Sequence, residues 1–199
     1  MTDRKRTLQA VAFEETFYKS SNGGVAIEIC KRLTLEDTDG ALIDVTGIDD
    51  RAVLEELRCL EITPSTLMAF SLFPSIHVAW ADGMLEPSEK AAILNSAEHL
   101  GIAPESTAFK LLDSWLTREP HDELLLAWRN FIHSVSPKLS TTAFEKLRYA
   151  AMKRAQVVAQ AAGGFLGFHA TSESEKAAIA ELESVFADAL LRPSLVDES

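Results

Sequence analysis

Several residue types and patterns are scarce in this sequence, and each scarcity excludes a class of protein. Only two cysteines occur in 199 residues, Cys30 and Cys59, and their spacing fits no metal-binding motif. A disulfide framework is therefore not expected, which suits a cytoplasmic location. No uninterrupted apolar run reaches about 18 residues, so no transmembrane helix is expected. No apolar stretch follows the charged residues 1–6, which argues against a secretory signal.

Basic residues are fewer than acidic residues in this chain. Lysines and arginines number 19 against 30 aspartates and glutamates, which gives a formal net charge of −11 at pH 7. Binding to a nucleic-acid backbone requires clustered Lys and Arg, and here the basic residues are scattered. We therefore expect no nucleic-acid partner. An acidic surface favours solubility, cations or basic partners.

Alternating β-branched segments are also almost absent, whereas helical patterns dominate. The sequence predicts an all-α fold, with capping boxes that start at Thr142 and Ser172. Its expected parts are an N-terminal helical extension at 1–60, a helical domain at 61–192 and a frayed tail at 193–199. The expected helices lie at 7–20, 25–33, 51–60, 64–72, 76–80, 87–100, 104–116, 120–136, 143–162 and 173–190.

The polar segment 34–50 is expected to be rich in turns, with Gly40 supplying a positive φ. Asp37 and Asp39 precede this glycine, as in a calcium-binding loop. The pattern does not make an EF-hand, however, because Leu35 and Thr46 would occupy positions that require acidic ligands.

One phrase occurs twice in the sequence. The first copy has VAWADG at 78–83 and SEKAAI at 88–93, and the second has VAQAAG at 158–163 and SEKAAI at 174–179. In each copy an apolar helix is expected to end at a glycine, and an acidic start signal opens the next helix. A duplicated helix–turn–helix predicts a bundle in which two halves pack together with an internal pseudo-twofold repeat.

The first copy resembles the TerB-like family, which is named for bacterial tellurite-resistance proteins. The resemblance lies in an alanine-rich helix that ends in Ala-Asp-Gly at 81–83, followed by Glu89 in the first turn of the next helix. It covers roughly residues 65–190, and the second copy departs from it because Ala162 replaces the aspartate. The resemblance implies an all-α, non-enzymatic, cytoplasmic scaffold or adaptor linked to stress response.

The resemblance also implies acidic residues that are suspected of binding a divalent cation. The matching positions are Asp82, Glu86 and Glu89. Oxygen ligands gathered at a tight turn are what Ca²⁺ or Mg²⁺ requires. The same residues also fit structural roles, because Glu89 can accept a hydrogen bond from the helix start and Asp82 can accept from the amides of the turn. Both alternatives stay open from sequence.

The segment 163–168 joins glycines to three large apolar side chains, Phe165, Leu166 and Phe168. These side chains either fold back into the core or form an exposed patch that docks on a protein or on a membrane surface. The second alternative would make the chain a protein-interaction module that needs no metal.

No catalytic constellation stands out in the sequence. The five histidines form no zinc-binding pair, no serine lies in a G-x-S-x-G motif, and the glycines do not form a nucleotide-binding loop. We expect His77 to be a partly buried core histidine, and Trp80, Trp115 and Trp128 to be core residues. The sequence therefore predicts a non-enzymatic protein with another protein as partner, and leaves its oligomeric state open.

Overall fold

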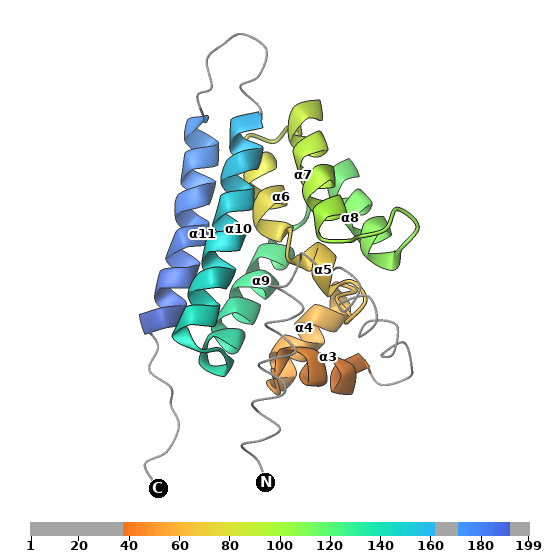
Figure 1. The fold of residues 1–199 in the computed structure, drawn as a ribbon, viewed down its shortest axis with the longest axis vertical. Helices are drawn as coiled ribbons and strands as arrows, with labels where there is room; N and C mark the ends of the chain where they lie inside the picture. The colour runs from red at the N-terminus through yellow and green to blue at the C-terminus, as the bar shows by residue number, and fades with distance from the viewer. Residues whose placement is uncertain (1–37, 162–170, 192–199) are drawn as a thin grey trace, which may run out of the picture.

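A computed structural model gives the fold of the chain and describes residues 38–161 and 171–191 (Figure 1). Within these ranges every regular element is helical and no strand occurs, so the all-α prediction is confirmed there. No helix in the same ranges is long and apolar enough to cross a membrane. The elements are α3 (Thr38–Thr46), α4 (Arg51–Cys59), α5 (Leu67–Phe70), α6 (Phe73–Ala79), α7 (Pro87–His99), α8 (Thr107–Thr117), α9 (Asp122–Val135), the 3₁₀ turn η1 (Ser136–Lys138), α10 (Thr141–Ala161) and α11 (Glu173–Leu191).

Helix α10 lies at the centre of the main group of packed helices. It contacts α6, α7 and α11, and Figure 1 shows it between α11 and α6. Among the described helices, α6 and α10 share the most extensive contact. Val78 and Val158, which begin the two copies of the repeated phrase, are both fully buried. The two helices that carry this phrase therefore pack against each other in the core.

Helices α3, α4, α5 and α8 extend this core. Helix α4 packs on α3 and α9, and α5 packs on α8. Leu42 of α3 and Leu57 of α4 are fully buried in the same hydrophobic cluster as the two valines of the repeated phrase. The described residues of the predicted N-terminal extension therefore share a core with the helices that follow residue 61.

The expected turn at Gly40 is wrong, because this glycine lies inside α3. Leu42 and Val45 are three positions apart and are 0% and 4% exposed, so the helix buries an apolar face. The burial of these two side chains outweighs the cost of placing a glycine within a helix, which is about 1 kcal/mol relative to alanine. Thr46 closes the helix by donating its hydroxyl hydrogen to the Leu42 carbonyl at 2.7 Å. The positive φ falls instead at Gly47, at 73°.

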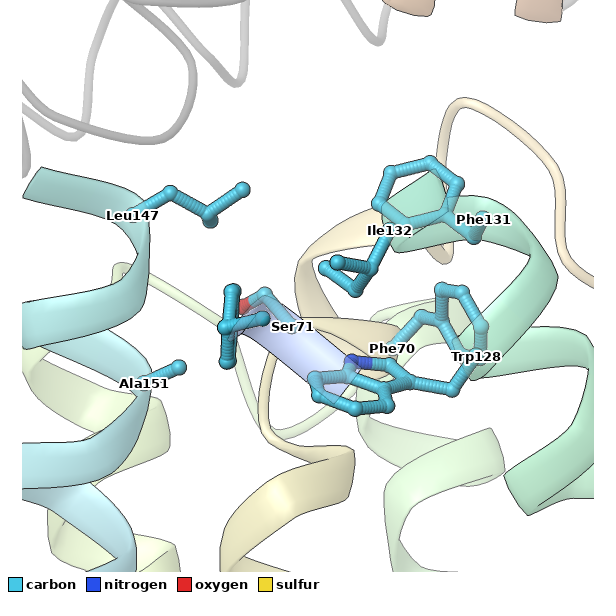
Figure 2. A pocket seen from close by; sticks show the side chains of 8 residues that line it. Phe70, Ser71, Trp128, Phe131, Ile132, Leu147 and Ala151 are labelled. Carbon is cyan, nitrogen blue, oxygen red and sulfur yellow. The ribbon is translucent and has the colours of Figure 1, made fainter. Parts of the chain in front are cut away.

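Aromatic rings fill the core where α5, α9 and α11 meet. Phe70 and Phe131 make an edge contact with ring centroids 5.5 Å apart, and Trp128 and Phe186 make another at 5.4 Å. Figure 2 shows the small void beside these rings, with Leu147 of α10 opposite the side chains of α9. The void holds about 10 Å³, the lower limit for one water molecule, so it is a packing gap and not a ligand site.

Candidate functional site

Glu89 lies in the first turn of α7 and is only 3% exposed. Its Oε2 accepts a hydrogen bond of 2.8 Å from the backbone N–H of Glu86. Pro87 opens the helix, and glutamate at the third helical position reaches back to the preceding amide. The structural role expected for Glu89 is therefore confirmed, and it is carried out by a buried carboxyl group.

Glu175 has the same role at the start of α11. It is 5% exposed, and its Oε2 accepts from the Ser172 N–H at 2.6 Å. The Ser172 hydroxyl accepts in turn from the Glu175 N–H at 3.1 Å, which completes the predicted capping box. The second carboxylate oxygen of Glu175, Oε1, is buried and accepts no hydrogen bond from any residue that the structure describes. A buried carboxylate oxygen without a donor is costly in free energy.

Glu89 and Glu175 interact electrostatically, because the negative charge of Glu175 acts on the carboxyl group of Glu89. Burial raises the pKa of Glu89 from 4.5 to about 7, and the negative charges of Glu175, Glu86 and Asp82 add to this rise. The hydrogen bond from the Glu86 backbone lowers the pKa of Glu89 and offsets part of the effect. Helices α7 and α11 both begin at the upper end of Figure 1. We call the four residues Asp82, Glu86, Glu89 and Glu175 the acidic corner.

The three candidate metal ligands do not form a ready-made cluster. Asp82 and Glu86 are exposed, and Asp82 Oδ1 accepts a hydrogen bond of 3.0 Å from the Met84 N–H. Across the described ranges, no group of three or more His, Cys, Asp or Glu side chains is arranged to hold a metal ion. Whether a cation binds here therefore stays a prediction.

Sequence reasoning did not include Glu175 among the candidate ligands. A signal for it was present, because Glu89 and Glu175 hold the same position in the two SEKAAI segments. The other predicted site, Phe165, Leu166 and Phe168, lies outside the described residues. Its role in partner binding stays a prediction.

His77 is half-buried, as expected, and belongs to a cluster of charged and polar side chains that spans three helices. Its Nε2 lies 3.2 Å from Glu181 Oε2, and Arg129 Nη2 donates to Glu181 Oε1 at 2.9 Å. The ring of His77 also stacks on Phe73, with centroids 5.6 Å apart. These contacts fix the imidazole at the end of α6.

The expected burial of the tryptophans is confirmed for Trp115 and Trp128, which are 9% and 3% exposed. Trp80 is only half-buried, and its indole N–H donates to the Trp115 carbonyl at 2.9 Å. This bond ties the end of α6 to α8.

No protein-family model matches the chain, and no curated protein or solved structure shows significant similarity to it.

Proposed function

We propose that this protein is a cytoplasmic, non-enzymatic scaffold of the TerB-like type that binds a divalent cation at the acidic corner. The observation that carries the proposal is the buried pair Glu89 and Glu175, which comes from equivalent positions of a repeated phrase. Each uses one oxygen to hold its own helix start. Glu175 keeps a buried oxygen that has no hydrogen-bond donor among the described residues. A cation beside that oxygen would offset the cost of its burial.

The chemistry of the corner favours a hard cation. All of its side-chain donors are carboxylate oxygens, which Ca²⁺ and Mg²⁺ prefer, and no imidazole or thiol is among them. Glu89 and Glu175 would hold the ion. Asp82 and Glu86, which are exposed at the edge, would supply further oxygens or bind its water shell.

A cation at this corner would connect the two copies of the repeat. In this proposal α6–α7 and α10–α11 are the related halves of a pseudo-twofold bundle, joined in the core by the contact between α6 and α10. The ion would link the start of α7 to the start of α11. It would thereby select one relative packing of the halves, and a partner protein could distinguish that packing from the ion-free one.

Calorimetric titration of the chelator-treated full chain with Ca²⁺, Mg²⁺, Mn²⁺ and Zn²⁺ at pH 8 tests this function. We expect saturable binding of Ca²⁺ or Mg²⁺, and a melting temperature that rises with ion concentration. Glu175→Gln keeps an oxygen for the Ser172 N–H but loses the charge, so it should weaken binding at least about tenfold. Glu98→Gln, at an exposed position of α7, is the matched control and should bind normally. Absence of heat with all four ions, together with an unchanged melting temperature, would remove the cation from the proposal.

A further inference from the structure

A hollow of about 210 Å³ lies between the end of α6 and the connection from α8 to α9. We call it the α6–α9 hollow. None of its lining residues belongs to the acidic corner, although Ala81 directly precedes Asp82 in the chain. Four of its lining residues are buried or half-buried and apolar or aromatic: Phe73, Trp80, Ala81 and Leu125. The polar ones are His77, Glu119, His121 and Asp122, and Pro120 completes the lining.

The walls of this hollow are held in place by long-range contacts. The Trp80 indole is anchored by its hydrogen bond to the Trp115 carbonyl. The His77 ring is anchored by Glu181, which Arg129 holds from the other side. A site whose walls are fixed before binding loses less conformational entropy when a ligand enters.

The charge of the hollow selects the kind of ligand. Glu119 and Asp122 carry formal negative charges, and among the described residues that line it there is no lysine or arginine. The charge of the nearby Arg129 is paired with Glu181. Carboxylates form strong charge-assisted hydrogen bonds with ammonium and guanidinium groups, and the face of a tryptophan ring attracts the same cations.

The volume of the hollow sets the size of the ligand. Sites for drug-sized molecules and cofactors hold about 300–1,000 Å³. At about 210 Å³ the α6–α9 hollow is too small for these, and it suits one group of the size of an amino-acid side chain.

We propose that the α6–α9 hollow binds an organic cation of side-chain size, an alkylammonium or alkylguanidinium group, with its charge beside Glu119 and Asp122 and its alkyl chain against Trp80. A free amine and the Lys or Arg side chain of a basic peptide present the same chemistry. A second hollow of about 250 Å³ shares residues 119–121 with the first and is lined by Leu60, Trp115 and Leu124 among others. A peptide can cover both hollows, whereas a small free amine fills only the first.

An NMR titration of the ¹⁵N-labelled full chain with butylguanidinium chloride, at constant ionic strength, tests this site. We expect a saturable shift of the Trp80 indole N–H signal, and none with butylurea, the neutral analogue of the same shape. Glu119→Gln should weaken the affinity about tenfold, as the loss of one charge-assisted contact predicts. Glu123→Gln removes an exposed charge next to the hollow and should bind as the unaltered chain does.

Glu119 lies between α8 and α9, so its substitution removes the charge without changing a helix. Asp122→Asn is a second variant, checked for folding by its melting curve because Asp122 also lies in the first turn of α9. A titration that does not saturate, a response to butylurea equal to that of butylguanidinium, or equal binding by Glu119→Gln and Glu123→Gln would overturn the proposal.

A further titration, with the peptide acetyl-Leu-Ala-Ala-Arg-amide, distinguishes the two sources of the cation. If the natural ligand is a basic peptide, this probe should bind at least about tenfold more tightly than butylguanidinium, because its leucine covers the second hollow. Leu60→Ala should then remove the gain and leave butylguanidinium binding unchanged. Equal affinities of the two probes would support a free amine as the ligand of the same site.

Discussion

The buried carboxyl group of Glu89 should make the folded state less stable as the pH rises from acidic to neutral. In the unfolded chain this group has its ordinary pKa of 4.5, whereas burial raises the pKa to about 7 in the folded chain. Between these values the folded state holds a proton that the unfolded state has released. Its contribution to stability is therefore fully present below pH 4.5 and is lost as the pH rises through 7.

The size of the effect follows from the two pKa values. The difference between 7 and 4.5 corresponds to about 3 kcal/mol in the free energy of unfolding, at about 1.36 kcal/mol for each pH unit. Glu89→Gln removes the titration, and its amide oxygen can still accept from the Glu86 N–H. We expect the variant to gain about 3 kcal/mol relative to the unaltered chain between pH 4 and pH 8.

Urea unfolding followed by circular dichroism, at five pH values from 4 to 8 and with a chelator present, measures this difference. Other carboxylates titrate in both chains and cancel when the two are compared. Glu98→Gln, an exposed substitution on the same helix, should follow the unaltered chain at every pH. A difference between Glu89→Gln and the unaltered chain that stays constant from pH 4 to 8 would refute the reasoning.

Two further substitutions test the packing and the backbone. Phe186→Ala should lower the free energy of unfolding by about 3–5 kcal/mol, because Phe186 is fully buried and its ring contacts Trp128 and Phe144. Chemical denaturation measures this loss. A loss below about 1 kcal/mol would contradict the described core. Gly83→Ala should cost about 1 kcal/mol in thermal unfolding, because the φ of 83° at Gly83 is strained for an L-residue, whereas an added Cβ would meet no atom within 4 Å and so adds no clash. Gly83→Asn should cost less, because asparagine tolerates this conformation better, and a reversed order would contradict the conformation.

Local signals in the sequence predicted much of the helical structure. Gly101 was expected to end a helix, and it directly follows the C-cap Leu100 of α7 with a positive φ. Gly83 also has a positive φ, but α6 ends earlier, at Ala79, so this glycine belongs to the turn after the helix. The capping box at Ser172 is also confirmed. The box expected at Thr142 is wrong, because the Ser140 side chain instead accepts from the Ala143 N–H at 3.2 Å and α10 begins earlier. Serine is preferred over threonine at the N-cap, and here Ser140 takes that position.

Long-range contacts explain why the sites were harder to predict. Glu89 and Glu175 are separated by most of the described chain, and only the packing around α10 brings the starts of α7 and α11 into electrostatic contact. His77 and Glu181 are 104 positions apart. Periodicity gives the apolar face of each helix, but it does not tell which faces meet.

The two SEKAAI segments open α7 and α11 with the same six residues in different surroundings. Ile93 is fully buried, whereas Ile179 is half-buried. The exchange rate of an unprotected amide depends on its immediate neighbours in the chain, and these are the same for the inner residues of both segments. Each segment therefore serves as the reference for the other. Any difference in deuterium uptake between 89–93 and 175–179 would report the difference in local opening free energy between the starts of the two helices.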